Sequence, residues 1–475
     1  MQADSISHAD RPLRWLRALL LLLAIKALWL WADAMPRLFM GDSTSYLLAA
    51  ASHWMPPDRS FTYPFFLRYA VMPWQSPYAL IVAQSLLGAV SAWLVWLLLR
   101  RRLGVPEWLA LAAAALFACD PAQVFYERMV MAEACGGLAL IAMFYATVEY
   151  AVSGRVRWLV AMQYLGLLSV SLRLNLLPVV LTMGVIAPLL SWTRPSTSAH
   201  AGRRIALHLL LAIGLLAGLH GGYRQFVARE FDTAPAWLAR SGLMKFGLVA
   251  PLVKPQQLWA EGISPNVLSL LHYELADPDL RNAQMWAPYG LGDVLGFSLD
   301  SEGDALAGRI AQRALREDPM GLLRLDFHNA MNYFDPPEYR LRLRLDEAWD
   351  HPYPPHTQVL AKQVLRASIA GSERIDSPAR RWFGLGSFWL VLSWLALAPL
   401  GFLAWQSLRR DGRIRAGNVL LLYALGLPAS HLLFSAINSF RYLHPMPAFA
   451  LIALAVLAAP RAVSAQRPSA LTRDS

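Results

Sequence analysis

Residues 11–34, RPLRWLRALLLLLAIKALWLWADA, form a long apolar run that begins with three arginines, and MGDSTSY follows at residues 40–46. As a helix, a run of this length spans the roughly 30 Å hydrocarbon core of a bilayer. Arginines mark the cytoplasmic end of such a segment, so the chain should emerge on the outer side just before residue 40. The second stretch then places one carboxylate, Asp42, beside the membrane with three hydroxyl side chains directly behind it.

Composition extends this interpretation to the whole chain. Of its 475 residues, 56% are hydrophobic and only 16% are charged, and the mean hydropathy is +0.37. Soluble domains are about 45–50% apolar and about 25% charged, so a polytopic membrane protein is indicated and a large soluble enzyme is excluded. The net charge of +11 comes mainly from short arginine clusters between apolar segments. No basic stripe interleaves with aromatic residues, so no nucleic-acid partner is expected.

The arginine clusters also predict the topology. About ten apolar segments of roughly 20 residues can be counted along the chain. With a cytoplasmic N-terminus, every cluster between helices falls on the cytoplasmic side. We therefore predict an all-α polytopic protein of the inner (cytoplasmic) membrane with both termini in the cytoplasm. The expected crossings are residues 13–34, 78–99, 108–125, 131–150, 158–172, 174–192, 205–220, 383–405, 418–434 and 446–459.

Three parts follow from this topology. Residues 1–222 should form an N-terminal transmembrane module, whose first outer loop, residues 36–77, carries the polar stretch quoted above. Apolar residues at helical spacing within residues 43–54 predict an amphipathic helix on the membrane surface. Residues 223–382 lack a convincing spanning segment but are too many for an unstructured loop, so we expect a mostly helical extracytoplasmic domain. Residues 383–475 would hold the last transmembrane helices and a cytoplasmic tail.

Carboxylates at the outer ends of these helices are the first site candidates, because charge near the hydrocarbon boundary is costly without a partner or a function. Asp42 could accept a proton from an attacking hydroxyl or help hold a divalent cation on a phosphate; it could instead cap the surface helix. Glu133 could be a second catalytic carboxylate, or an acid favoured by the dipole of its own helix. Glu127 and Asp120 are weaker candidates for the same role.

Three arginines, Arg59, Arg173 and Arg441, lie on the outer side, against the charge bias of the rest of the chain. A guanidinium binds phosphate through two parallel hydrogen bonds, so these residues suit an anionic substrate. Snorkelling to the interface, or pairing with an outer carboxylate, is the alternative.

Motifs for other chemistry are missing. The sequence has no Gly-rich phosphate loop with its lysine, no His-Glu-x-x-His and no Gly-x-Ser-x-Gly. His53 and His444 lack metal-ligand spacing, so packed or surface histidines are expected. Cys119 and Cys135 fall near the outer ends of neighbouring helices, and two separate buried thiols are favoured over a disulfide.

Taken together, these features resemble the C-type glycosyltransferases of membranes, which include the protein O-mannosyltransferases and the lipid A aminoarabinose transferases. The resemblance covers most of the membrane part, residues 11–192 most clearly, and the large outer domain matches only in position. The residues that carry it are 41–46 (GDSTSY), Arg59 with Tyr63 and Pro64, 121–133, and 440–447 (FRYLHPMP).

The resemblance implies transfer of a sugar from a polyprenyl-phosphate donor to an acceptor at the outer, periplasmic face, with inversion at the anomeric carbon. Asp42 would be the catalytic base and Glu133 the second acidic catalytic residue, and both could hold a divalent metal cation such as Mg²⁺, Mn²⁺ or Zn²⁺. An apolar groove among the helices would hold the polyprenyl tail. The substrate-binding residues would be Arg59, Tyr63, Arg173, Arg441, Tyr442 and His444.

One departure from the family pattern bears on the acceptor. The protein O-mannosyltransferases usually carry an Asp-Glu pair in the first loop, whereas Ser43 follows Asp42 here. A lipid or glycan acceptor is therefore expected rather than a protein. Two alternatives remain open. One is a transporter or binding protein for a lipid or polyprenyl-linked substrate, without covalent chemistry. The other is a polysaccharide polymerase or ligase with a different membrane fold.

Overall fold

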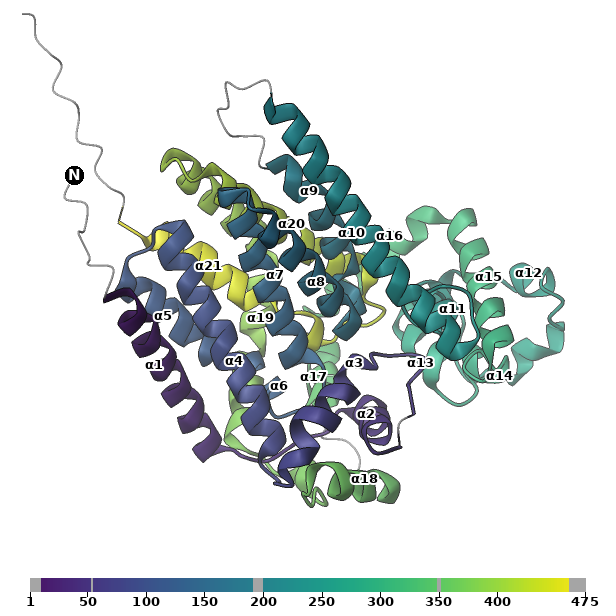
Figure 1. Ribbon diagram of the computed structural model, residues 1–475. Helices are drawn as coiled ribbons and strands as arrows, with labels where there is room; N and C mark the ends of the chain where they lie inside the picture. Colours follow the sequence, from purple (N-terminus) through teal and green to yellow (C-terminus); the bar gives the residue numbers. More distant parts are fainter. Residues whose placement is uncertain (1–9, 53, 191–199, 348–351, 461–475) are drawn as a thin grey trace, which may run out of the picture.

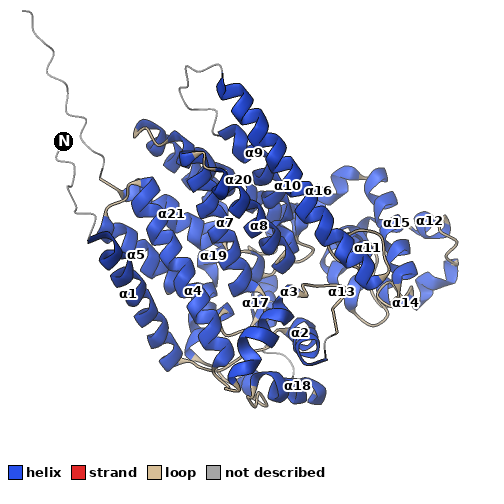
Figure 2. Ribbon diagram, in the orientation of Figure 1, coloured by secondary structure: helices blue, strands red, loops and turns tan. Residues whose placement is uncertain are grey.

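The computed structural model describes residues 10–52, 54–190, 200–347 and 352–460 (Figure 1). This part of the chain is helical and contains no strand, which confirms the all-α prediction (Figure 2). Six of its helices are long and apolar enough to cross a membrane, so the chain has the character of a polytopic membrane protein. They are α1 (Asp10–Ala32), α4 (Ala79–Leu98) with its continuation η3 (Leu99–Leu103), α7 (Glu133–Ser153), α10 (His200–Phe231), α19 (Pro378–Arg410) and α20 (Ile414–Phe434).

The other expected crossings correspond to shorter apolar helices, so length and composition do not establish the predicted count of ten. These helices are α5 (Glu107–Ala118), α8 (Val156–Leu172), α9 (Leu177–Leu190) and α21 (Met446–Ala458). The remaining α-helices are α2 (Met40–Ser52), α3 (Thr62–Phe66), α6 (Pro121–Tyr126), α11 (Ser241–Val249), α12 (Pro255–Trp259), α13 (Arg281–Trp286), α14 (Leu291–Val294), α15 (Ser301–Glu317), α16 (Pro319–Met331), α17 (Pro336–Asp346) and α18 (Pro355–Leu365).

Helix α7 is the centre of the bundle and packs against α4, α8 and α20. It is apolar on nearly every side, as a helix enclosed by other helices has to be. Small residues allow close packing elsewhere in the bundle: a Cβ added at Gly401 in α19 would lie 2.3 Å from the Cβ of Ala424 in α20. Close approach at small residues is how helices associate inside a bilayer, where van der Waals contact replaces the hydrophobic effect.

The arginine-rich turns gather at one end of the bundle. Arg413, in the turn between α19 and α20, donates a hydrogen bond to the carbonyl of Leu103 at the end of η3 (2.7 Å). Arg204, in α10, donates to the carbonyl of Gly154 just after α7 (3.0 Å). This end is at the top of Figure 1, opposite α2 and α18. Segments that the positive-inside pattern assigned to one side therefore do lie side by side.

The opposite end carries α2, which overlaps the helix predicted in the first outer loop. Its apolar face does not stand free, because Leu47 and Ala50 pack with Val364 and Leu365 of α18. A hydrogen bond of 2.9 Å between the hydroxyls of Thr44 and Thr357 joins the same two helices. Its position on a membrane surface stays a prediction.

The region between α10 and α19 is divided rather than single. Helices α11–α16 form a lobe at one side of the bundle (Figure 1), with a core that includes Leu243, Phe246 and Ile310. By contrast, α18 packs on α2 and α17 contacts the segment before α21. The predicted boundaries after residues 222 and 382 both fall inside helices. The first lies within α10, which runs to Phe231, and the second lies within α19, which begins at Pro378.

Candidate functional site

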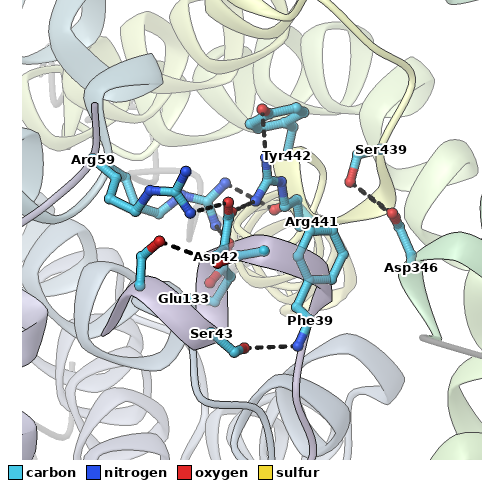
Figure 3. Close-up of polar contacts among 12 residues, drawn as sticks. Phe39, Asp42, Ser43, Arg59, Glu133, Asp346, Ser439, Arg441 and Tyr442 are labelled. Atoms are coloured by element: carbon cyan, nitrogen blue, oxygen red, sulfur yellow. Dashed lines mark hydrogen bonds and ion pairs between the residues drawn. The ribbon is translucent and has the colours of Figure 1, made fainter. Parts of the chain in front are cut away.

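Asp42 is held between two arginines from distant parts of the chain (Figure 3). Its Oδ1 accepts a hydrogen bond from Arg59 Nη1 and its Oδ2 accepts one from Arg441 Nη1, both at 2.6 Å. Arg59 lies between α2 and α3, and Arg441 lies in η10 (Phe440–Tyr442), just before α21. We call these three residues the clamp. Asp42 is the third residue of α2, so it lies inside the first turn rather than at the N-cap position.

Ser43, the departure from the family pattern, anchors the start of α2. Its buried hydroxyl accepts a hydrogen bond from the backbone N–H of Phe39 (2.7 Å) and donates one to the carbonyl of Val130 (2.9 Å). Backbone hydrogen bonds join Arg37 to the same segment. A glutamate at position 43 would bury an unpaired charge, so this fold favours a small hydroxyl there. The anchor fixes the position from which Asp42 reaches the arginines.

A second ion pair lies beside the clamp. Arg173, directly after α8, has Nη1 3.4 Å from Oε1 of Glu133, the first residue of α7, and each side chain is only 5% exposed. Arg173 Nη2 donates to the backbone carbonyl of Arg441 (3.0 Å), which ties the pair to the clamp. Within the described residues, Arg173 Nη1, Glu133 Oε2 and Arg441 Nε have no hydrogen-bond partner. The two guanidinium nitrogens are buried donors without a partner, and a ligand could satisfy them.

The arginines decide the charge state of Asp42. Burial raises the pKa of its carboxyl, but the positive charges of Arg441 and Arg59 outweigh burial and leave the pKa below its ordinary value. Arg441 also lies over the rings of Phe39 and Tyr442, each with its centroid 4.9 Å from the guanidinium carbon. Asp42 is therefore an anion at neutral pH, held by two fixed cations.

Clamp and ion pair line one cavity of about 290 Å³. Its charged residues come from the bundle and from the segment 42–59. Its apolar residues come from both the bundle and the lobe, so the cavity lies between the two. The polar lining includes Asp42, Asp58, Arg59, Glu133, Arg173, Asn175 and Arg441, and the apolar lining includes Leu172, Leu238, Met244, Leu248, Met285, Trp286, Phe434 and Ile437.

Compared with known proteins, this chain matches no family model, no curated protein and no solved structure. The resemblance to the C-type glycosyltransferases therefore stays a prediction from the quoted motifs. Asp42, Arg59 and Arg441, from three of those motifs, meet at the clamp. Glu133, which ends a fourth motif, lines the same cavity.

Two predicted substrate-binding residues do not reach the cavity. Tyr63 is fully buried, and its hydroxyl donates to Oε1 of Gln84 (3.0 Å). His444 is also buried, and its Nε2 lies 2.9 Å from Oε1 of Gln123. Both therefore belong to the protein interior, because helix packing turned their side chains away from the outer face. Tyr442, in contrast, lines the cavity and accepts a hydrogen bond from Arg441 (3.0 Å).

The remaining candidates have structural roles or cannot be placed. Asp120 caps α6 and accepts hydrogen bonds from the N–H groups of Ala122 and Gln123 at 3.0 and 3.1 Å. Glu127 pairs with a buried lysine away from the cavity. Cys119 and Cys135 are free thiols, as expected, but each is half-buried rather than buried. His53 lies outside the described residues.

Two acidic residues of this region were missed in the sequence. Asp58 holds Arg59 by a two-point contact, with Nη2 2.5 Å and Nε 3.2 Å from its carboxylate oxygens. Asp346 accepts hydrogen bonds from the hydroxyl of Ser439 (2.9 Å) and the N–H of Phe440 (2.6 Å), and so fixes the segment that carries Arg441 (Figure 3). Only the adjacency of Asp58 to Arg59 could have indicated the first; no local pattern marks the second.

The carboxylates do not fit the predicted metal site. Asp42 and Glu133 both line the cavity, but each is already paired with arginine. A divalent cation would have to displace these guanidinium groups and then lie among their positive charges. Within the described residues, no three His, Cys, Asp or Glu side chains form a group able to hold a metal ion. The arrangement suits an anion with an apolar tail better than a cation.

Proposed function

We propose that the protein is an integral membrane glycosyltransferase. It would move a sugar from a polyprenyl-phosphate donor to a lipid or glycan acceptor at the periplasmic face of the inner membrane. The observation that carries this proposal is one cavity whose lining combines three arginines with many apolar residues. Guanidinium groups suit the phosphate, and the apolar lining suits the first isoprene units of the tail.

The proposed topology uses all ten expected crossings. The shorter helices α5, α8, α9 and α21 would cross together with the six long ones, with the arginine-rich end and both termini in the cytoplasm. The contacts among the arginine-rich turns support this orientation. The cavity then opens at the opposite, periplasmic end, where lipid-linked donors present their sugar.

The chemical step needs one base and one set of cations. The oxygen of an acceptor hydroxyl attacks the anomeric carbon from the side opposite the phosphate, and a new C–O bond forms. The bond between that carbon and the phosphate oxygen breaks, and the phosphate leaves with the electron pair. The hydroxyl proton passes to a carboxylate oxygen of Asp42. Arg59, Arg173 and Arg441 stabilise the charge on the leaving phosphate, and a single displacement inverts the anomeric carbon.

Donor binding also prepares the base. Both oxygens of Asp42 are engaged by arginines, so one of them has to be released before it can accept a proton. A phosphate competes for the same guanidinium hydrogen bonds and brings negative charge beside the carboxylate. Losing an arginine and gaining an anionic neighbour both raise the pKa of Asp42. The carboxylate thus becomes a stronger base only where a donor is bound.

The test uses purified full-length protein in nanodiscs with a panel of radiolabelled polyprenyl-phosphate sugars, and with envelope lipid extract as acceptor. Wild type should release label from one donor, and Asp42→Asn should lower that rate by about 10²–10⁴-fold. The matched control is Asp376→Asn, which removes an exposed carboxylate paired with Arg381 and should leave the rate unchanged. Full activity of Asp42→Asn would overturn the base assignment. Tight binding of a donor that wild type never consumes would favour a lipid-handling protein.

A further inference from the structure

Helix α16 exposes a continuous apolar stripe. Its residues recur at spacings of three or four positions and therefore share one face of the helix. The only charged exposed residue on α16 is Arg324, at the edge of the stripe. So many large apolar side chains on one face mark an interaction surface rather than a surface in water. The stripe consists of Met320 (59% exposed), Leu323 (45%), Phe327 (68%) and Met331 (46%), and Phe334 (46%) continues it past the end of the helix.

The opposite face of α16 packs on the spanning pair α19 and α20. The side-chain amide of Asn329 donates to the carbonyl of Ser435, immediately after α20 (3.2 Å). The ring of Tyr333 lies 5.8 Å from that of Trp394, a residue in the middle of α19. The end of α16 therefore lies at a level of the bundle that a membrane-spanning helix occupies.

The two candidate spanning helices near α16 also expose large apolar side chains. In α19, Leu385 and Phe388 are 79% and 63% exposed, and in α20 Leu425 is 47% exposed. These residues belong to helices that are long and apolar enough to cross a membrane. Helix α17, which follows α16, is held on α19 by a contact of 2.5 Å between the hydroxyls of Tyr339 and Ser387. Because α16 packs against a candidate spanning helix and turns its stripe away from it, lipid is favoured over a protein partner as the occupant of the stripe.

We propose that α16 is an interfacial helix whose apolar stripe is buried among the acyl chains of the leaflet at the cavity end of the bundle. Arg324, paired with Asp318, would then lie among the lipid headgroups. The contact would anchor the lobe to the bilayer. It would thereby hold the residues that the lobe contributes to the cavity, Met244 and Met285 among them, at the level where a lipid-linked molecule enters. This inference does not depend on the proposed sugar transfer.

Site-directed spin labelling tests the proposal on the full chain. Single cysteines replace Met320, Leu323, Phe327 or Met331 in a Cys119→Ala/Cys135→Ala background, reconstituted in vesicles of phosphatidylethanolamine and phosphatidylglycerol. Collision with oxygen, which concentrates in lipid, is compared with collision with a water-soluble nickel chelate. The stripe positions should show a several-fold higher oxygen-to-nickel ratio than cysteines at Glu302 and Gln312, exposed residues of α15. Equal ratios would place the stripe in water, and protection from both reagents would place it against protein; either result overturns the proposal.

A second measurement covers variants that fail to reconstitute. Cysteines at Phe327 and Met331 are treated in native membranes with a charged maleimide, before and after detergent solubilisation. Labelling should be low in membranes and rise several-fold in detergent, whereas a cysteine at Glu302 should react equally in both. Rapid labelling of the stripe in intact membranes would contradict its burial in lipid.

Discussion

Two groups of charges in this protein have the same ion-pair distance and opposite surroundings. In the first, Lys26 Nζ lies 2.6 Å from Glu127 Oε1, and the two side chains are 2% and 0% exposed. A Cβ added at Gly88 would lie 1.8 Å from that glutamate oxygen, so the helices enclose the pair completely. In the clamp, the two distances from Asp42 are also 2.6 Å, but the side chains are 17–27% exposed and line the cavity. A short ion pair therefore does not mark a site; an adjoining cavity does.

The largest expected effect is the loss of stability when the enclosed pair of Lys26 and Glu127 is broken. Lys26→Met leaves the Glu127 carboxylate buried without its cation, which should lower the free energy of unfolding by about 3–5 kcal/mol. The midpoint of thermal unfolding in detergent measures it. The double variant Lys26→Met/Glu127→Gln removes both charges and should recover most of the loss. If Lys26→Met has the same unfolding midpoint as wild type, the pair does not stabilise the fold as its enclosure indicates.

The second-largest effect is expected for a change in the clamp, and it concerns ligand binding rather than stability. Arg441→Gln removes a charged hydrogen-bond donor, worth about 1.5–3 kcal/mol. It should therefore weaken the binding of a short-chain polyprenyl phosphate by about 10–100-fold. Titration calorimetry in detergent measures the affinity, and the unfolding midpoint should stay near that of wild type. Arg381→Gln, at an exposed arginine that pairs with Asp376, is the matched control with unchanged affinity. Unchanged binding by Arg441→Gln would remove the clamp from the anion site.

A smaller effect of opposite sign comes from Asp42→Asn. Without the carboxylate, Arg59 and Arg441 lose a competitor for the phosphate, and a partly exposed ion pair contributes up to about 1 kcal/mol. The same ligand should therefore bind about 2–5-fold more tightly, although sugar transfer is lost. Weaker binding instead would show that Asp42 holds the ligand itself. It would contradict the proposal that the phosphate replaces Asp42 as the partner of the two arginines.

The smallest effect concerns pH. Burial raises the pKa of Asp346 from 3.8 to about 6, although Arg342 and Arg441 oppose the shift. The folded state therefore binds this proton more strongly than the unfolded state. Its stabilising contribution is complete below pH 3.8 and is lost as the pH rises through about 6. Relative to Asp346→Asn, which does not titrate at this position, the unfolding midpoint of wild type should fall as the pH rises from 3.8 to about 6. Outside this window the difference between the two midpoints should stay constant. A constant difference between them within the window would refute the raised pKa.

Features that depend on local sequence were predicted well. Apolar length and the arginine bias are properties of single segments, so the all-helical fold and the shared end of the arginine-rich turns followed from them. The residues of the site were predicted from the sequence only in part. Asp42, Glu133, Arg59, Arg173, Arg441 and Tyr442 line the cavity, whereas Tyr63 and His444 are buried away from it. A side chain's direction depends on the helices packed around it, and no local pattern carries that information.

What the sequence determined by itself is a helical membrane protein with its basic turns on one side and a small set of charged residues on the other. Hydrophobicity and charge along the chain suffice for that, because the bilayer acts on each segment separately. Only the tertiary structure joined Asp42 to Arg441, buried Asp346 beside the segment before α21 and brought apolar residues of the lobe to the cavity. The first two contacts link residues 399 and 94 positions apart, and all three arise from the packing of the whole bundle.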